Sequence, residues 1–411
     1  MPQGLAKRLS VIVPSITLEV SARANDLRSR GIDVVNFGVG EPDFEPPAFV
    51  LNAAKSAIDA GKTSKYTAVT GMASLKQAIC AATEQKRGYL PTPDQVTVSV
   101  GAKHSLFNVA LALYEAGDEV IIPAPCWVSY PEQVRMFGAE PILVPTSAEN
   151  GWRLSPGDLA RALSPRTKAV ILCTPSNPTG AAYSEDEMRA LLDVVRAHDC
   201  YIVVDEIYGD LVYDGFRHVS AARIAPDLLP RLVIIDGVSK SYAMTGWRIG
   251  WSIAPRAIAR ACDIVQGQST TNPTAVAQYA AVAALTGPQQ EVEAMRAAFQ
   301  TRRDVMVSAL NAIPGVRCRT PEGAFYAFPD CRGLYGLTWK GKAITNDEEL
   351  AFFLLERAHV AAVPGGAFGA PGYLRFSYAT SEDRIRAGIA AVRDAVESAS
   401  QTNHAGAAAV G

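Results

Sequence analysis

The chain has 411 residues, of which 48% are hydrophobic and 19% are charged, and its formal net charge is −2. A chain of this length has enough apolar residues for more than one packed unit. The near-neutral charge and the lack of a basic run give no electrostatic reason to expect nucleic acid or an anionic membrane as a partner.

The spacing of the cysteines and the length of the apolar runs indicate in which cellular compartment the protein is expected. The seven cysteines are scattered and form no C-x-x-C pair, which is typical of reduced thiols rather than a disulfide framework or a zinc site. The apolar run after Arg8 stops at Pro14, too early for a secretion signal. No apolar run approaches the ~18 residues that cross a bilayer. We therefore expect a soluble cytoplasmic protein with no metal site and no membrane contact.

The middle of the chain alternates β-branched runs with helical patterns. The predicted strands cover residues 95–100, 118–123, 167–173, 201–205 and 231–236. One helix is predicted to begin near Ala102 and another near Ser184, where "SEDE" resembles a capping box. Strands that are apolar on both faces and separated by helices favour a mostly parallel sheet covered on both sides.

The pattern changes near residue 296. A long charged helical stretch leads into "GAFYAFPD", "HVAAVPG" and "YLRFSYA", and a last helix is predicted from Thr380 to about Ser398. We expect a large α/β domain at 49–295 and a small α+β domain at 296–400. The N-terminal segment 1–48 would supply part of the small domain through a helix near 18–30, and 401–411 would be a disordered tail.

Each predicted strand ends in residues that core packing does not require. In chain order these are Gly101-Ala102-Lys103, Trp127, Asn177, Asp205 with Tyr208, and Lys240. Any one of them has an ordinary explanation as a helix cap, a turn former, a core aromatic or a solvated lysine. In open α/β sheets, however, ligands bind beyond the carboxyl ends of the strands. The prediction rests on all five ends meeting in one crevice.

These residue types together suit one cofactor. Pyridoxal 5′-phosphate has an aldehyde for a lysine, a pyridine nitrogen for a carboxylate, and a phenolic oxygen for a tyrosine and an amide. Its flat ring suits a tryptophan, and its phosphate suits the start of a helix. We therefore expect this cofactor.

Five motifs, taken in order, make the prediction more specific. They are "GEPDF" (40–44), "SNPTG" (176–180), "VVDEIY" (203–208), "SKSYAMTGWRIGW" (239–251) and "YLRFSYAT" (373–380). Together they resemble the class I and II aminotransferases of fold type I, most of all the bacterial aspartate aminotransferase branch, from about residue 8 to residue 398. The resemblance implies an α/β fold: a large domain with a mixed, mostly parallel sheet, plus a small α+β domain.

The resemblance assigns a role to each residue around the cofactor ring. Lys240 matches the lysine that forms the Schiff base and moves the proton at the substrate Cα. Asp205 matches the aspartate that pairs with the ring nitrogen. Asn177 and Tyr208 match the pair that binds the phenolic oxygen, and Trp127 matches the aromatic that stacks on the ring.

The phosphate would be held by Gly101, Ala102, Lys103 and Arg248. Tyr66 matches a tyrosine that reaches the phosphate of the neighbouring subunit, which implies a homodimer with composite active sites. Ser239 could add a hydroxyl. Position 237 is glycine, where another branch of the family carries a phosphate-binding serine, so the site is expected to lack one donor. Gly246 is expected to permit a tight turn between Lys240 and Arg248.

The substrate contacts follow from the same resemblance, with Trp127 and Asn177 contributing as well. Arg375 matches the arginine that grips the α-carboxylate, for which a planar guanidinium is suited, and Gly40 supplies a backbone contact nearby. For the distal carboxylate, this branch uses a lysine and N-terminal hydroxyls, which match Lys103, Ser15 and Thr17. A cation at a helix N-terminus is unfavourably placed unless an anion compensates it. We therefore predict aspartate or glutamate and 2-oxoglutarate or oxaloacetate as substrates of a ping-pong reaction.

Other activities share most of these motifs. A prephenate or aromatic aminotransferase of the same branch is not separated by them, and neither is a β-lyase or a cyclopropane-forming synthase. A cofactor-binding regulator would need a DNA-binding domain, and no basic helix-turn-helix pattern is present. A nicotinamide oxidoreductase would need a Gly-rich βαβ fingerprint, which "GVG" at 38–40 does not supply.

Overall fold

The computed structural model describes residues 4, 6–13 and 16–408. In this part of the chain the central sheet has seven strands in the order β2-β8-β7-β6-β5-β3-β4. Their bounds are β2 (Val96–Val100), β3 (Glu119–Ala124), β4 (Glu140–Pro145), β5 (Thr167–Cys173), β6 (Tyr201–Asp205), β7 (Leu232–Gly237) and β8 (Ile249–Ile253). The strands β3 to β7 pair in parallel, whereas β8 runs antiparallel to both β2 and β7. The predicted α/β fold with a mostly parallel sheet is confirmed.

All five strands predicted from apolar runs are present, but β4 and β8 were missed. β4 lies at the edge of the sheet, and most of its residues are partly or fully exposed, so its sequence is less apolar than that of a central strand. β8 is fully buried, but it follows the Gly-punctuated stretch 239–248, which hides its beginning. β8 pairs antiparallel with β7, so the chain returns to the sheet after the loop that carries Lys240.

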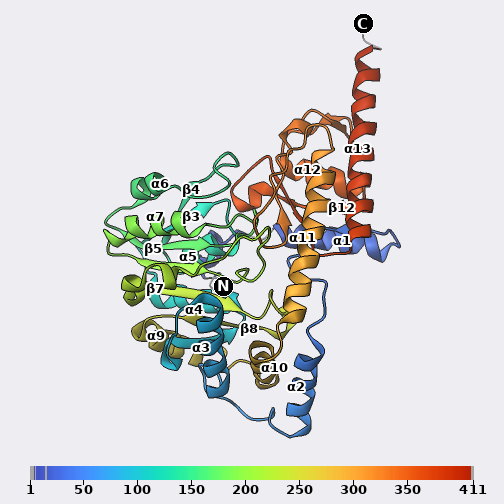
Figure 1. The fold of residues 1–411 in the computed structure, drawn as a ribbon. Coiled ribbons are helices and arrows are strands. Elements are labelled where there is room, and N and C mark those ends of the chain that lie inside the picture. Colours follow the sequence, from blue (N-terminus) through green and yellow to red (C-terminus); the bar gives the residue numbers. More distant parts are fainter. Residues whose placement is uncertain (1–3, 5, 14–15, 409–411) are drawn as a thin grey trace.

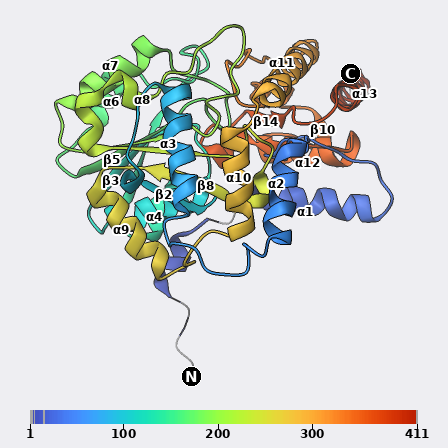
Figure 2. The ribbon, with the colours of Figure 1, turned by 60° about the horizontal axis from the view of Figure 1, so that its bottom comes forward.

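Helices cover both faces of this sheet, and Figures 1 and 2 show their arrangement. The helices of this part are α2 (Ala48–Asp59), α3 (Ala73–Arg87), α4 (Ala102–Leu113), α5 (Ser129–Met136), α6 (Pro156–Ala162), α7 (Glu185–Arg196), α8 (Ala221–Ile224), α9 (Arg256–Gly267) and α10 (Ala275–Thr286). Alternate residues of one strand face opposite layers. Val203 of β6 packs in the cluster with α4, α5 and α9, whereas Ile202 and Val204 pack in the cluster with α3, α7 and α8.

A second part of the molecule lies beside the sheet, on the right of Figure 1. Its helices are α1 (Ile16–Ser29), α11 (Gln290–Asn311), α12 (Asp347–Arg357) and α13 (Glu382–Ala408). Its short strands are β1 (Val35–Asn36), β9 (Tyr326–Ala327), β10 (Thr338–Trp339), β11 (Lys342–Ala343), β12 (Val360–Ala361), β13 (Val363–Pro364) and β14 (Leu374–Ser377). The strands β13, β14 and β9 form a small antiparallel sheet.

The N-terminal segment belongs to this second part by contact. β1 pairs in parallel with β12, and Val20 and Ala24 of α1 are buried with Leu355 and Ala361. The predicted docking of the N-terminal helix is thus observed. The predicted domain limits at residues 48, 295 and 400 stay a proposal.

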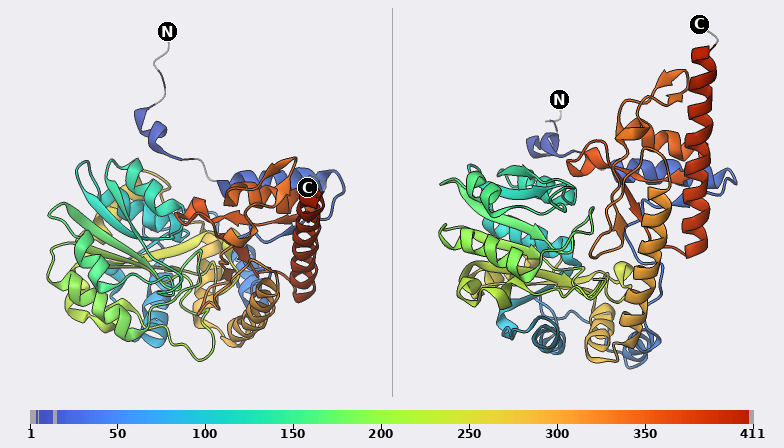
Figure 3. Two further views of the ribbon diagram at one scale, coloured as in Figure 1. Left: turned by 90° about the horizontal axis from the view of Figure 1, so that it is seen from above. Right: turned by 45° about the horizontal axis from the view of Figure 1, so that its top comes forward.

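The C-terminal helix is longer than its sequence pattern predicted. Both panels of Figure 3 show α13 at one side of the molecule, close to α11. It continues to Ala408, past the expected end near Ser398, so 401–408 are helical where a disordered tail was predicted. Alanine has the highest helix propensity of all residues, and the stretch 405–409 is rich in it. The last residues, 409–411, lie outside the described part.

Among the described residues, no helix combines the length and apolar character that a membrane span requires.

Candidate active site

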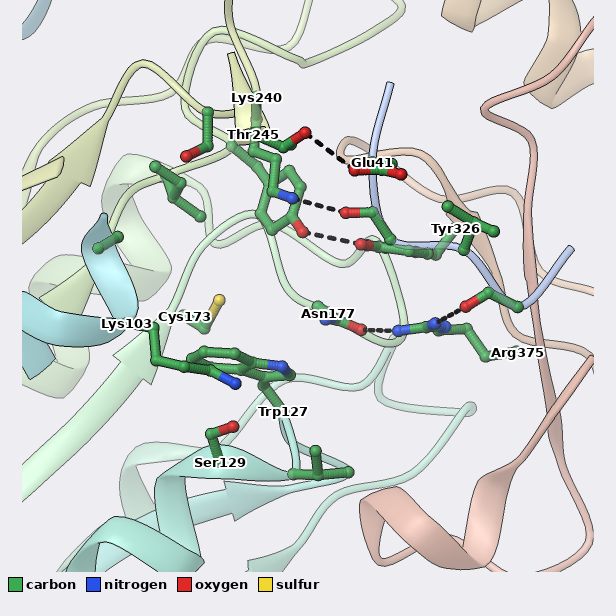
Figure 4. A pocket seen from close by; sticks show the side chains of 18 of the residues that line it. Glu41, Lys103, Trp127, Ser129, Cys173, Asn177, Lys240, Thr245, Tyr326 and Arg375 are labelled. Atoms are coloured by element: carbon green, nitrogen blue, oxygen red, sulfur yellow. Dashed lines mark hydrogen bonds between the residues drawn. The ribbon is translucent and has the colours of Figure 1, made fainter. Parts of the chain in front are cut away.

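A cavity of about 810 Å³ lies where the carboxyl ends of the central strands meet the second part of the molecule. Figure 4 shows side chains from both parts pointing into it. The predicted site residues that line it are Gly40, Ala102, Lys103, Trp127, Asn177, Asp205, Tyr208, Lys240, Arg248 and Arg375. Residues spread over most of the sequence thus meet at one site, as the strand-end argument expected.

Lys240 follows β7 and points across the cavity. Its Nζ donates a hydrogen bond to the carbonyl oxygen of Gly40 at 2.6 Å. Burial lowers the pKa of Lys240 to about 8, although the nearby Glu41 carboxylate opposes that shift. A lysine with this pKa has a large neutral fraction near neutral pH, which a nucleophilic amine needs.

Asp205 ends β6 at the floor of the cavity and is 3% exposed. Its Oδ2 accepts a hydrogen bond from the Tyr130 hydroxyl at 2.7 Å, and its Oδ1 accepts one from the backbone N–H of Ile207 at 3.1 Å. Burial raises the pKa of Asp205 to about 6, and the two hydrogen bonds oppose that rise. Above that pH the site holds a buried carboxylate.

Arg375 lies in the middle of β14 and is 3% exposed. Its Nη1 donates to Oδ1 of Asn177 at 2.9 Å, and its Nη2 donates to the carbonyl oxygen of Gly38 at 2.7 Å. Its Nε is buried without a hydrogen-bond partner in the described part of the chain. Every residue of β14 is buried, so Arg375 does not lie on a solvated strand face.

A pair of tyrosines closes the space between Lys240 and Arg375. The hydroxyl oxygens of Tyr208 and Tyr326 are 2.8 Å apart, and the Arg375 guanidinium lies over the Tyr326 ring, 4.6 Å from its centroid. A Cβ on Gly40 would lie 3.2 Å from the Tyr326 hydroxyl. Tyr326 was missed from the sequence, where "GAFYAFPD" indicated only a change of domain.

The residues predicted to hold the phosphate lie around the start of α4. Gly101 precedes this helix in the left-handed region, with φ 85°. A Cβ there would lie 2.5 Å from Nη2 of Arg248, so glycine allows the guanidinium to approach the helix start. Arg248 also has a left-handed backbone, with φ 56°, and its Nη1 donates to the Thr245 carbonyl oxygen at 2.7 Å. Ser239 lines the same cavity.

The structure explains the glycine at position 237 and differs from the expectation for Gly246. Gly237 has no room for a serine, because a Cβ would lie 2.9 Å from Cα of Gly250 and 3.0 Å from the Ile249 carbonyl oxygen. The turn between Lys240 and Arg248 does not depend on Gly246. The positive-φ residues of this stretch are Ala243 and Arg248.

Lys103 and Trp127 lie on the opposite side of the cavity from Arg375 in Figure 4. The Lys103 Nζ is 4.9 Å from the centroid of the Trp127 ring, a cation–π arrangement. Burial and then the nearby Arg248 lower the pKa of Lys103. No acidic side chain forms an ion pair with Lys103 among the described residues.

Four predicted site residues are not among the described residues that line the cavity: Gly101, which directly precedes Ala102, and Tyr66, Ser15 and Thr17. Tyr66 is 89% exposed and does not line the cavity of its own chain. Ser15 lies outside the described residues, and for Thr17, in α1, only the backbone is described.

Other lining residues were not predicted. They include Glu41, Tyr130, Cys173 and Tyr326. Glu41 stands inside the quoted "GEPDF" motif, and Cys173 ends a predicted strand. Both therefore carried a positional signal. Tyr130 carried none, because it lies inside a helix.

Known proteins match both the sequence and the fold. The family model described as aminotransferase class I and II matches residues 32–392. The chain is 48% identical to the aspartate/prephenate aminotransferase of Cereibacter sphaeroides, over 95% of this chain and 98% of that protein. It is 46% identical to the aspartate aminotransferase of Geobacillus stearothermophilus, over 94% of this chain and 97% of that protein.

Solved structures agree. The crystal structure of the aspartate aminotransferase from Rhizobium meliloti superposes with a TM-score of 0.93 at 44% identity, covering 96% of this chain and 99% of that one. The structure of the Thermus thermophilus aspartate aminotransferase with maleate superposes with a TM-score of 0.89 at 40% identity, covering 96% of this chain and 100% of that one. Sequence, fold and site agree, and the chain belongs to the class I and II aminotransferase family and is an aminotransferase.

Proposed function

We propose that this aminotransferase binds pyridoxal 5′-phosphate in the cavity and moves an amino group between aspartate or glutamate and a 2-oxo acid, 2-oxoglutarate or oxaloacetate. The reaction is ping-pong: the amino donor leaves before the acceptor binds. The observation that carries the proposal is that Lys240, Asp205 and Arg375 all line one cavity. Membership of the family implies the cofactor.

The residues around the cavity fit this cofactor. Gly101 leaves space for Arg248 beside the first turn of α4, where backbone N–H groups favour a phosphate. The buried Asp205 carboxylate suits a protonated ring nitrogen. Arg375 binds Oδ1 of Asn177, which leaves the Asn177 NH₂ group free to donate to the phenolic oxygen. When bound, the cofactor supplies an electron-accepting ring and a carrier for the amino group.

The chain's own groups then orient the substrate and move one proton. Arg375 grips the substrate α-carboxylate through its fork of donors. Lys240 would take the proton from the substrate Cα and hold it on Nζ, and its pKa of about 8 suits this exchange. Trp127 would stack on the cofactor ring, and Tyr208 would donate to its phenolic oxygen.

The distal side of the cavity favours a dicarboxylic substrate. Lys103 is a partly buried cation that has no acidic partner in the described part. It lies across the cavity from Arg375, so the two cations would bind the two ends of aspartate. The Thermus relative was solved with maleate, which is itself a dicarboxylate. Ser15 and Thr17 stay proposed contributors.

Prephenate is a second candidate acceptor. The relative from Cereibacter sphaeroides carries both substrates in its name, aspartate/prephenate aminotransferase. Prephenate carries two carboxylates, so the same pair of cations would bind it.

The enzyme is further proposed to be a cytoplasmic homodimer. The highly exposed Tyr66 side chain is free to complete the phosphate site of a partner subunit. All seven cysteines are free, and each is buried or partly buried, which agrees with a reducing compartment.

A panel of amino donors, each assayed with 2-oxoglutarate and with prephenate, tests the proposed function. Aspartate and glutamate should be the best donors, and the amino group should be recovered on the acceptor. Lys240→Ala should abolish transfer for every pair. Release of pyruvate or thiol without amino transfer would indicate a lyase and contradict the proposal.

A further inference from the structure

Tyr130 is the second residue of α5 and forms part of the cavity wall, where it is 2% exposed. Its hydroxyl donates to Oδ2 of Asp205 at 2.7 Å. Its ring meets the Trp127 ring edge-on, with centroids 5.3 Å apart and planes at 86°. One side chain therefore contacts both the carboxylate proposed for the ring nitrogen and the aromatic proposed for the ring face.

The two oxygens of Asp205 are held from two different elements. Oδ1 is bound by the backbone N–H of Ile207, just beyond β6, and Oδ2 is bound by Tyr130 from α5. Two donors on two oxygens fix the plane of a carboxylate as well as its position. The start of α5 is itself anchored, because the Tyr130 N–H donates to the Trp127 carbonyl oxygen at 3.0 Å.

The charges around Asp205 make this contact important. The ionisable side chains that act on Asp205 are Tyr130 on α5, Cys173 on β5, the adjacent Glu206, and Lys240. Burial and the Glu206 charge raise the pKa of Asp205, whereas the Tyr130 hydrogen bond and Lys240 lower it. Burial raises the pKa of Tyr130 well above its ordinary value, so Tyr130 stays protonated and acts only as a donor to the carboxylate.

We infer that Tyr130 is a positioning residue for the cofactor: its hydroxyl holds the Asp205 carboxylate in the orientation that the ring nitrogen needs, while its ring braces Trp127. The inference rests on the proposed function. The Tyr130 hydroxyl donates to Asp205 and its ring packs against Trp127, so Tyr130 would act on the cofactor through these two residues.

The substitution Tyr130→Phe removes the hydroxyl and keeps the ring against Trp127. A hydrogen bond to a charged group contributes about 1.5–3 kcal/mol, so the apoprotein should bind pyridoxal 5′-phosphate about 10- to 100-fold more weakly. Tryptophan fluorescence measures this affinity without turnover. At saturating cofactor, kcat should fall while KM for the amino donor stays unchanged, because the hydroxyl that is removed donates to Asp205.

The pH dependence separates positioning from simple packing. Only ionised Asp205 attracts the protonated ring nitrogen, so cofactor affinity falls as the pH drops through the pKa of Asp205, about 6 in the wild type. Loss of the donor raises that pKa, so Tyr130→Phe should move the midpoint upward by about one pH unit. Replacing Tyr130 with 3-fluorotyrosine, a more acidic phenol and a stronger donor, should move it downward.

Tyr213→Phe is the matched control. Tyr213 is also buried, at 1% exposed, and its hydroxyl donates to the Ala324 carbonyl oxygen rather than to Asp205. This variant should leave both the affinity and the midpoint unchanged. If Tyr130→Phe does not fold, the protein with 3-fluorotyrosine at position 130 still tests the inference through its midpoint. It should fold, because the substitution replaces one ring hydrogen with a fluorine atom.

The outcomes are distinguishable. If the wild-type apoprotein does not bind pyridoxal 5′-phosphate, the proposed function fails. If the wild type binds it and the Tyr130 variants keep the wild-type midpoint, or shift it no more than Tyr213→Phe does, the inference about Tyr130 alone is overturned.

Discussion

Lys103 stands in the first turn of α4, where the partial positive charge of a helix N-terminus disfavours a cation. Arg248 is close enough to lower its pKa further. The described side chains provide no carboxylate to offset these costs. A bound dicarboxylate would relieve them, which supports the proposed role of Lys103 in substrate specificity.

Lys103→Ala should therefore weaken dicarboxylic substrates selectively. A charge-assisted hydrogen bond contributes about 1.5–3 kcal/mol, so kcat/KM for aspartate should fall about 10- to 100-fold. The values for alanine and phenylalanine should change far less. Steady-state kinetics at saturating cofactor measure all three, and Lys55→Ala, an exposed lysine of α2, is the control. An equal loss for every amino acid would remove the reason for proposing aspartate.

At the scale of elements, β8 and α4 meet at a contact that only glycine permits. A Cβ on Gly250 would lie 2.2 Å from the Ala102 nitrogen and 2.7 Å from the Gly101 carbonyl carbon. These are backbone atoms, and a real Cβ does not approach them so closely. The antiparallel strand β8 thus fixes the start of the helix that is proposed to bind the phosphate.

Gly250→Ala should push α4 away from β8 and disturb the phosphate site. Overpacking of this kind costs about 1–3 kcal/mol of unfolding free energy, and cofactor affinity should fall with it. Chemical denaturation and cofactor titration of the apoprotein measure the two effects. Gly246→Ala is the control, because a Cβ at Gly246 meets nothing within 4 Å and its φ is not in the left-handed region. If both variants behaved alike, the close approach would not matter.

At the scale of the whole molecule, the cavity is a junction of two parts. Lys240 binds the carbonyl oxygen of Gly40, and Asn177 binds Arg375. Each of these contacts joins the region of the large sheet to the second part, so the site depends on how the two parts are placed. Tyr66 would extend the site to a second subunit, because its side chain is exposed in its own chain and is proposed to act in the partner subunit.

Mixed dimers test this composite site. Lys240→Ala and Tyr66→Ala should each impair turnover, the second through weaker cofactor binding at a limiting cofactor concentration. The two variants are unfolded together and refolded, so that about half of the dimers contain one subunit of each variant. Each of these heterodimers would have one fully wild-type site and one site that lacks both residues. Activity should then recover to about a quarter of the wild-type level. If the mixture shows no gain over the separate variants, Tyr66 does not act across subunits.

The sequence alone was enough for the layer architecture and for the residues beyond the strand ends. Apolar runs such as 167–173 and 201–205 became β5 and β6, because a strand buried on both faces carries its signal in local composition. Asp205 and Lys240 were identified for the same reason, since position after a strand is a local property. The capping box at Ser184 formed as expected at the start of α7.

Other features of the site depend on contacts between residues that are distant in sequence, and only the tertiary structure shows them. Tyr130 lies 75 positions from Asp205 in sequence, and Tyr326 lies 118 from Tyr208, so no local pattern pairs them. The crowding that excludes a serine at Gly237 comes from β8, a strand that the Gly-rich sequence concealed. The local sequence determines where most strands of the sheet begin and end. Which side chains support the site is decided by packing between residues that are distant in sequence.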